Sequence, residues 1–340
     1  MSEFDPALNV SRQSVIDDFM ARLGVVEGRF VSVVGAAGIG KTWVMADVFL
    51  QMAKLPEDRK VLPFWLSVTV GSHYPGGDEV VPDCSGENGR IQWLKSAMAK
   101  INQALGQKKI TYDDTYDFNV NFDAFCQTIC EEMPGWCPVL FFDGYDDLNA
   151  SETDYWQEKI AQFWSPQCTL TFLGRRDHNK IRDPRFGWDE KIVVLQPFVD
   201  EQRDEQITKK EQALPTPPNP TPPAQVLNRH TTGNPFINAW LFDYVVQHRI
   251  SSITKADLEA CLDAYLVRAN VSVSSRDLVI QLGQELSPVW TTSDLETLAP
   301  QIKVDDPPMK PLFANGVVCG IKSTPRYKLD DGLYELIQMI

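Results

Sequence analysis

The sequence predicts an α/β fold in which a parallel β-sheet carries helices on both faces. Through about the first 200 residues, short apolar runs alternate with longer segments of helical periodicity, and this alternation is typical of a parallel sheet. Several of the runs are apolar at almost every position, as in strands that are covered on both faces. A glycine-rich segment, residues 35–40, joins the first apolar run to the next helix.

The elements follow in a regular order. Residues 13–23 form the first predicted helix, because their apolar positions recur at helical spacing. The predicted strands are residues 30–34, 61–70, 139–142, 169–173 and 191–195. The other helices of this region are predicted at residues 42–53, 90–105, 121–132 and 152–163, and residues 71–90 are a long polar loop. Pro63 favours the edge of the sheet or the start of its strand, because proline cannot donate to a ladder.

The composition changes after Phe198. A charged stretch over 200–211 runs into six prolines between Pro215 and Pro223, so residues 201–224 are predicted to be an extended linker. A proline-rich ligand for another domain is the alternative for this stretch. Helices are predicted to resume at 235–249, 255–269 and 275–285, and two strands at 317–322 and 327–329.

Length and charge limit the classes of function. The 340 residues, 43% hydrophobic and 23% charged, indicate a globular chain of two or three domains, at about 150 residues per domain. The net charge of −14 disfavours nucleic acid and anionic membrane surfaces as partners. The N-terminus has no signal-peptide pattern and no run of 18 apolar residues occurs, so a cytoplasmic protein is expected.

Seven cysteines suit a reducing compartment better than a disulfide framework. The only loose cluster is Cys126, Cys130 and Cys137, and it has no partner pair at zinc-finger spacing. Buried structural thiols are therefore expected rather than a zinc site.

A phosphate-binding loop is the strongest motif in the sequence. Its eight residues match the pattern G-x-x-x-x-G-K-[ST]: Gly35, Ala36, Ala37, Gly38, Ile39, Gly40, Lys41 and Thr42. A predicted strand precedes the loop and a predicted helix follows it, so that backbone N–H groups and the helix N-terminus face the phosphates. Lys41 would contact the β- and γ-phosphates, and the Thr42 hydroxyl would ligate Mg²⁺.

Acidic residues follow the third predicted strand. Asp143 ends this apolar run, at the sheet edge where open α/β sheets bind ligands, and is predicted to be the second Mg²⁺ ligand. Asp146 or Asp147 could orient or deprotonate the attacking water. Arg175 ends the fourth strand and could contact the γ-phosphate, although a surface ion pair explains it equally well from spacing alone.

Taken in order, these segments resemble a STAND-class P-loop NTPase, the group that includes the NACHT and NB-ARC ATPases. The resemblance rests on the loop 35–42, the acidic strand end 143–147, the strand end at Gly174-Arg175, and Gly233-Asn234-Pro235-Phe236. Two shorter segments, Val10-Ser11-Arg12 and Leu195-Gln196-Pro197-Phe198, also resemble family motifs.

The resemblance implies ATP or ADP with Mg²⁺ as cofactors and a division into domains. A nucleotide domain over 1–200 would be followed by the linker 201–224, a small helical lid over 225–255 and a winged-helix-like domain over 256–340. Arg12 would lie beside the adenine, Pro235 would pack against it, and Arg175 would be the sensor arginine. Two departures are visible. Asp330 stands where the family has a histidine that contacts the ADP β-phosphate, and Asp147 stands in place of a catalytic glutamate.

The preferred hypothesis is a signalling switch that binds ATP or ADP, hydrolyses ATP slowly, and couples nucleotide state to domain closure and self-association. Family members usually carry effector and sensor modules, so this chain is either a fragment or has them as separate protein partners. The alternative is a nucleotide-binding scaffold that hydrolyses nothing. A winged-helix transcription regulator and a small-molecule kinase are further alternatives, the first disfavoured by charge and the second by the lack of a recognisable acceptor pocket.

Overall fold

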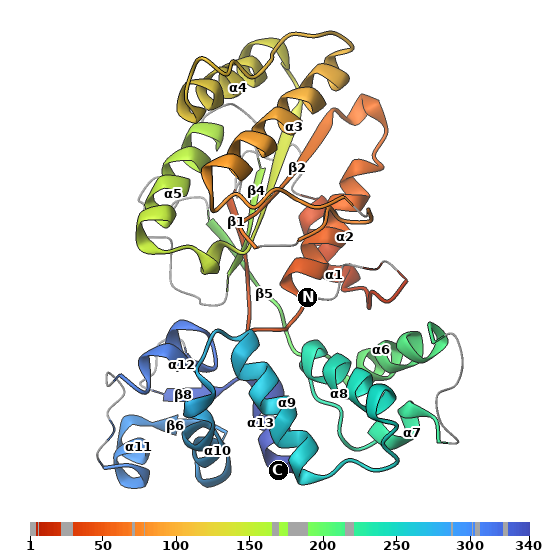
Figure 1. Cartoon of the computed structure of the whole chain (residues 1–340), viewed down its shortest axis with the longest axis vertical. Coiled ribbons are helices and arrows are strands. Elements are labelled where there is room, and N and C mark those ends of the chain that lie inside the picture. Colours follow the sequence, from red (N-terminus) through yellow and green to blue (C-terminus); the bar gives the residue numbers. More distant parts are fainter. Residues whose placement is uncertain are drawn as a thin grey trace. The chain divides into compact units, whose positions relative to one another are not determined.

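The structure is a computed structural model of the chain. It describes residues 5, 7–21, 30–69, 72–77, 79–164, 170–175, 190–214, 221–286, 288–300, 302, 307–321 and 326–340. The chain forms two compact units (Figure 1). The first unit comprises Ser11–Val34 and Lys41–Val193 with the first residues of the chain, and the second comprises Ala7–Val10, Gly35–Gly40 and Val194–Ile340.

A five-stranded parallel sheet forms the centre of the first unit. Its strands are β1 (Phe30–Val34), β2 (Val61–Ser67), β3 (Cys137–Asp143), β4 (Leu170–Arg175) and β5 (Glu190–Val194), in the order β2-β3-β4-β1-β5. This confirms the predicted α/β fold with its parallel sheet. The strand with Pro63 is at the edge, as the missing N–H of proline favours.

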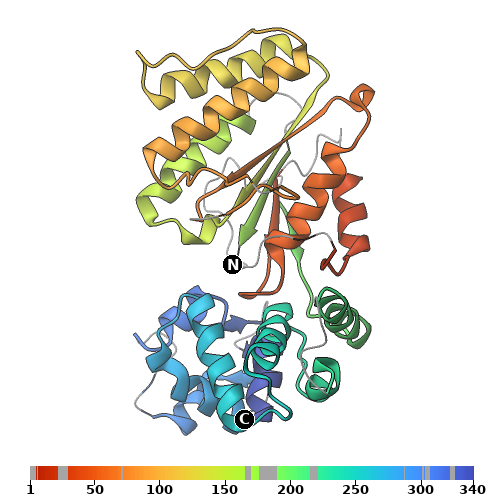
Figure 2. The same cartoon turned by 45° about the vertical axis from the view of Figure 1, so that its right-hand side comes forward.

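Helices cover both faces of this sheet, as Figures 1 and 2 show. The helices of the first unit are α1 (Gln13–Met20), α2 (Lys41–Ala53), α3 (Glu87–Leu105), α4 (Phe118–Glu132) and α5 (Ala150–Trp164). Consecutive residues of β2 point to opposite faces: Phe64 packs edge-on against Phe125 of α4, and Trp65 packs against Phe49 of α2. Both faces of the strands are therefore buried, which explains their nearly continuous apolar runs.

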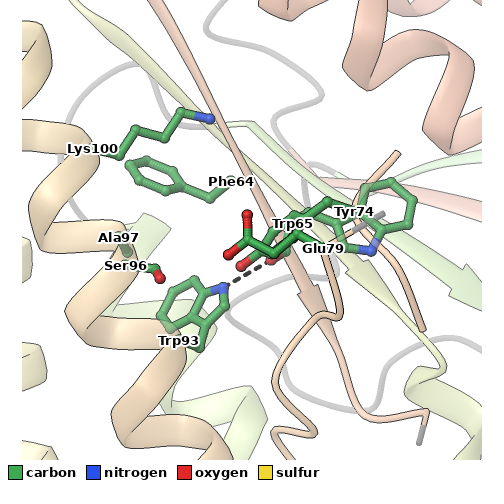
Figure 3. Close-up of a pocket in the computed structure, with 8 residues that line it drawn as sticks. All are labelled: Phe64, Trp65, Tyr74, Glu79, Trp93, Ser96, Ala97 and Lys100. Carbon is green, nitrogen blue, oxygen red and sulfur yellow. Dashed lines mark hydrogen bonds between the residues drawn. The ribbon is translucent and has the colours of Figure 1, made fainter. Parts of the chain in front are cut away.

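The free edge of β2 is covered by side chains of α3 (Figure 3). Trp93 donates its indole N–H to the carbonyl of Trp65 at 2.9 Å, and the Lys100 amine donates to the carbonyl of Pro63. Burial lowers the pKa of Lys100 to about 8. A cavity of about 140 Å³ remains between these residues and the loop that carries Tyr74 and Glu79. The side chains of Trp93 and Lys100 close an edge whose backbone groups could otherwise pair with another chain.

The second unit combines helices with a small antiparallel sheet. Its helices are α6 (Asp200–Gln212), α7 (Pro223–Leu227), α8 (Pro235–His248), α9 (Lys255–Arg268), α10 (Arg276–Glu285), α11 (Thr292–Leu298), α12 (Lys310–Ala314) and α13 (Asp331–Met339). The sheet has the order β6-β8-β7, with β6 (Trp290–Thr291), β7 (Val318–Gly320) and β8 (Arg326–Leu329). Helices α9, α10 and α13 with this sheet form the winged-helix-like part of the fold.

The prediction of a linker over 201–224 is wrong for its first half, because Asp200–Gln212 is a helix. Acidic residues lie in its first turn and lysines in its last turn, which complements the helix dipole. Ile207 and Gln206 are buried on one side of α6, and Lys209 pairs with Glu205 one turn earlier. Residues 215–220 of the proline-rich part lie outside the described residues.

Two further observations concern expectations from composition. Cys126 and Cys137 are buried as predicted, but Cys130 on the same helix as Cys126 is exposed. Burial raises the pKa of the Cys126 thiol, which keeps it protonated and unreactive. In the described part of the chain, the helices are too short or too polar to cross a bilayer.

Replacement of Phe125 by alanine should destabilise the first unit by about 3–5 kcal/mol, because this ring is completely buried between Phe64, Trp93 and Phe163. Val120→Ala in the same helix is the control, since Val120 is 48% exposed and should change stability little. Urea unfolding followed by tryptophan fluorescence measures both. Equal midpoints for the two variants would contradict the assigned core.

Candidate phosphate-binding site

The glycine-rich loop follows β1 and leads directly into α2, as the motif requires. Two of its glycines have backbone angles that other residues adopt only with strain, with φ of 74° at Gly38 and 95° at Gly40. The N–H of Ile39 points back to the carbonyl of Ala36 at 3.4 Å. The loop therefore curls sharply over the N-terminus of a 13-residue helix, where the helix dipole favours an anion.

The first unit brings together the two predicted metal ligands. The Thr42 hydroxyl donates to Oδ1 of Asp143 at 2.7 Å, although the two residues are 101 positions apart in sequence. Asp143 is the last residue of β3 and is 6% exposed. A hydroxyl and a carboxylate held together at the start of α2 are the oxygen ligands that Mg²⁺ takes in nucleotide sites.

Gly174 of the neighbouring strand leaves room for these groups. A Cβ atom at this position would lie 3.7 Å from Oδ1 of Asp143 and 3.9 Å from the Cβ of Lys41. The backbone of β4 thus lies directly beside both side chains. A larger side chain here would enter the space around Asp143, which the sequence pattern of Gly174-Arg175 alone did not reveal.

Arg175 ends β4, and its Cα pairs with that of Val34, the residue before the phosphate loop. Strands β3, β4 and β1 are neighbours, so Asp143, Arg175 and Val34 all lie at the carboxyl edge of the sheet. This is the edge at which parallel α/β sheets bind ligands. The side chain of Arg175 lies outside the described part of the structure.

Asp146 and Asp147 lie in a short 3₁₀ helix after β3, Tyr145–Asp147. Asp147 is exposed and accepts a hydrogen bond from the Thr69 hydroxyl at 3.3 Å. Asp146 is half-buried. Both closely follow the predicted metal ligand Asp143, and their role toward the attacking water remains a prediction.

Arg12 immediately precedes α1 and is 8% exposed. Burial lowers the pKa of its guanidinium to about 10, still far above neutral pH. The residue is therefore a buried cation in the first unit. Its predicted place beside an adenine remains a prediction.

The loop residues Gly35–Gly40 belong to the second compact unit. Ala37 is 3% exposed and belongs to the same apolar core as Ile237 and Leu333. Nδ2 of Asn234 donates to the carbonyl of Ala37 at 2.9 Å, and the N–H of Phe236 points to the carbonyl of Gly38 at 3.2 Å. Two carbonyls of the phosphate loop are thus held by the start of α8.

The segment that makes these contacts is itself fixed by buried polar groups. Asn238 accepts from the N–H of Thr232 at 2.7 Å and donates to its carbonyl at 2.9 Å. Gln206 of α6 donates to the carbonyl of Pro235 at 2.9 Å. Pro235 occupies the first turn of α8, where its missing N–H leaves no helical bond unmade.

Asp330 is the N-cap of α13, and its carboxylate accepts from the N–H of Leu333 at 3.0 Å. It is 8% exposed, and burial raises its pKa to about 6, with Asp331 adding to the rise. The nearby Asn234 side chain lowers this pKa in part. Asp330, which the resemblance sets in the place of a histidine, therefore lies next to the segment that contacts the phosphate loop.

Sequence reasoning missed the polar contacts that hold the loop. Asn234 was identified only as part of a motif, and Glu335, Asn238 and Gln206 were not identified at all. Their pairing depends on which faces of α6, α8 and α13 meet, and spacing along the chain does not specify that. The available signal was a single polar residue within an otherwise apolar stretch, as at Asn238 and Glu335.

A magnesium ion fits the residues present. Thr42 and Asp143 supply two oxygens at the end of the loop, and Mg²⁺ characteristically takes few protein ligands and completes its shell with phosphate and water oxygens. Within the described ranges, no group of three acidic, histidine or cysteine side chains forms a metal site made by protein alone. Any ion here would thus depend on a phosphate ligand.

The sequence matches no protein-family model and no curated protein. Among solved structures, it aligns with Cdc6p from Pyrobaculum aerophilum at 11% identity, over 99% of this chain and 95% of that chain, with a TM-score of 0.46. It aligns with a STAND protein with a tetratricopeptide repeat sensor from Pyrococcus horikoshii at 15% identity, over 97% of this chain and 42% of that chain, with a TM-score of 0.38.

A third alignment is with the ORC1 protein of Aeropyrum pernix in complex with DNA, at 11% identity, over 98% of this chain and 94% of that chain, with a TM-score of 0.44. At these values the likenesses support no conclusion about function. The strand–loop–helix unit with its motif, and the parallel order of the sheet, nevertheless give this chain the P-loop NTPase fold.

The two glycines of the loop should respond differently to alanine. Gly40→Ala should cost about 1–2 kcal/mol, because only the positive φ is strained and no atom lies within 4 Å of the new Cβ. Gly38→Ala should cost about 1–3 kcal/mol more, because its Cβ would lie 2.4 Å from the Cβ of Phe236. Thermal unfolding without ligand measures both, and an equal loss would contradict the packing of the loop on α8.

Proposed function

We propose that this protein is a nucleotide-dependent switch of the STAND type, which binds ATP or ADP with Mg²⁺ and hydrolyses ATP slowly. The observation that carries the proposal is the hydrogen bond of 2.7 Å between Thr42 and Asp143 at the end of a complete phosphate loop. It joins the loop to the strand end that would hold the metal. A glycine turn that arose by chance would not require a bond between Thr42 and Asp143.

The chain's own groups account for phosphate binding. The loop backbone over Gly35–Gly40 and the N-terminus of α2 offer positive partial charge, and Lys41 adds a full charge for the β- and γ-phosphates. Thr42 and Asp143 would hold Mg²⁺. When bound, the ion would supply charge that stabilises the phosphate oxygens. Pro235 and Arg12 are proposed to flank the base, and Arg175 to contact the γ-phosphate.

Slow hydrolysis follows from the acidic residues after β3. A base must reach a water positioned in line with the γ-phosphate. Asp147 is one methylene shorter than glutamate, and its carboxylate accepts from Thr69. A displacement of about 1 Å can cost about a hundredfold in rate. Asp146 is the second candidate for this role.

Coupling to the rest of the chain is supported by the packing of the loop. Gly35–Gly40 belongs to the same compact unit as residues 194–340, and Ala37 is part of its core. A change at the phosphates would therefore act directly on contacts within that unit. We propose that this coupling drives closure of the lid and winged-helix-like parts and self-association, with separate sensor or effector proteins as partners.

Lys41→Ala should weaken ATP and ADP binding by about 30- to 150-fold, because it removes a charged hydrogen bond to phosphate worth about 2–3 kcal/mol. Lys54→Ala is the control, since Lys54 is an exposed lysine just after the same helix. Isothermal titration calorimetry measures both. An unchanged affinity in the Lys41 variant would contradict the assignment of the phosphate loop.

Asp143→Asn should abolish Mg²⁺-dependent phosphate release while much of the nucleotide affinity remains, because it removes a metal ligand and leaves Lys41 and the loop in place. The wild-type rate should be well below about one turnover per second, far under typical enzymes. Asp146→Asn and Asp147→Asn identify the base. Binding of ATP with no phosphate release above the Asp143→Asn background would favour the non-hydrolysing scaffold.

A further inference from the structure

We propose that Asn234 and Asp330 are positioning residues for nucleotide binding, and that they fix the phosphate loop according to the position of α13. The chain of contacts runs from α13 through Asp330 and Asn234 to the carbonyl of Ala37, entirely within the second unit. The inference rests on the proposed function, because it assumes that this loop holds phosphate.

The Asn234 amide joins the phosphate loop to the start of α8. One N–H donates to the carbonyl of Ala37 at 2.9 Å, and the Asp330 carboxylate lies close enough to the side chain for the amide to lower the carboxylate's pKa. The amide oxygen accepts from the N–H of Phe236 at 3.0 Å. Since the side chain is completely buried, its orientation is fixed by these bonds. Only a residue that both caps α8 and donates to the carbonyl of Ala37 could replace Asn234.

Asp330 ties this amide to α13. Its carboxylate caps the helix through the N–H of Leu333 and lies 3.5 Å from the hydroxyl of Tyr265 on α9. A shift of α13 therefore moves a carboxylate that lies beside Asn234. Because interiors are densely packed, such a shift is passed on to the loop carbonyl rather than absorbed.

Close packing supports the same connection. A Cβ atom on Gly332, in the first turn of α13, would lie 2.5 Å from the Cβ of Asn234 and 2.6 Å from its backbone nitrogen. One turn later, Glu335 accepts from the N–H of Gly233 at 2.6 Å and from Arg203 at 2.9 Å. Near its N-terminus, helix α13 thus approaches residues 233–234 through Asp330, Gly332 and Glu335.

The pH dependence of the contact separates positioning from stability. The charged groups near Asp330 are Asp331 on its own helix and Lys328 on β8, with the phenol of Tyr265 on α9 and the thiol of Cys319 on β7. Burial holds the pKa of Asp330 at about 6, above its ordinary value of 3.8. Because the Asn234 side chain lowers this pKa, it interacts more favourably with the ionised carboxylate, so the loop is held best above pH 6.

Stability changes in the opposite direction. Because the folded pKa is raised, ionised Asp330 costs stability above about pH 6, and this cost is lost as the pH falls toward 4. If Asp330 had only a structural role, the protein would bind ADP no more weakly at low pH, because its stability is higher there. Weaker nucleotide binding on acidification, at rising local stability, is specific to the positioning role.

The first test adds one methyl group. Gly332→Ala should weaken ADP binding by about tenfold, because α13 or Asn234 must move to accommodate the Cβ, although alanine itself favours a helix. Gly320→Ala is the matched control in the same unit, since no atom lies within 4 Å of its new Cβ, and its ADP affinity should equal the wild type. Calorimetric titration with ADP measures all three proteins.

The second test removes the titration and keeps the cap. Asp330→Asn should weaken ADP binding about fivefold at pH 8, and the wild type should lose this advantage between pH 7 and pH 5. Titration of ADP itself occurs with both proteins and cancels in the comparison. Asn234→Ser, which retains an N-cap but loses both amide donors, should bind about tenfold more weakly at pH 8.

The outcomes are separable. If wild-type protein binds no ADP at any pH tested, the proposed function is wrong, and the positioning role with it. If the wild type binds ADP and the Gly332, Asp330 and Asn234 variants bind it equally well, the positioning role alone is wrong. Should Gly332→Ala fail to fold, the Asp330 and Asn234 variants decide the matter, because both retain their helix caps.

Discussion

The hydrogen bond from Asn234 to the carbonyl of Ala37 is the interaction on which the candidate site depends. A phosphate loop must hold a strained backbone in place before phosphate arrives. Here the loop carbonyls are held from outside, by the buried amide and the N-terminus of α8. Glycine at position 38 satisfies two separate constraints, because its φ is positive and a Cβ there would collide with Phe236.

A buried amide can hold this position only if all its partners are present. An unpaired polar group in the interior costs about 1–3 kcal/mol, so a partly satisfied network would be worse than an apolar contact. Thr232, Asn234 and Asn238 are completely buried and bond to one another, to Gln206 and to the loop. These bonds join α6 to α8, and Glu335 of α13 adds a bond to the N–H of Gly233, so the conformation of the loop depends on several helices of the second unit.

The sequence predicted what is encoded locally. The parallel sheet, its five strands and the pairing of Thr42 with Asp143 followed from apolar periodicity and one motif, because strand ends in such a sheet meet at one edge. The helix at residues 200–212 was predicted to be part of an extended linker, because its many charged residues suggested a solvated segment. Ile207 and Gln206 of this helix nevertheless face the interior. The role of Asp330 was not predictable, since it depends on the close approach of Gly332 to Asn234, 98 positions earlier in the chain.

The phosphate motif is divided between the two units at a single peptide bond. Gly35–Gly40 belongs to the unit of α13, whereas Lys41, Thr42 and Asp143 belong to the unit of the sheet. A nucleotide bound by the loop would act on the contacts that residues 35–40 make within the second unit. It can shift a conformational equilibrium only by the difference in its affinity for the two states. The contacts best placed to create this difference in affinity are those at Ala37 and Gly38. There the backbone that would bind phosphate is also held by Asn234, which lies beside Asp330.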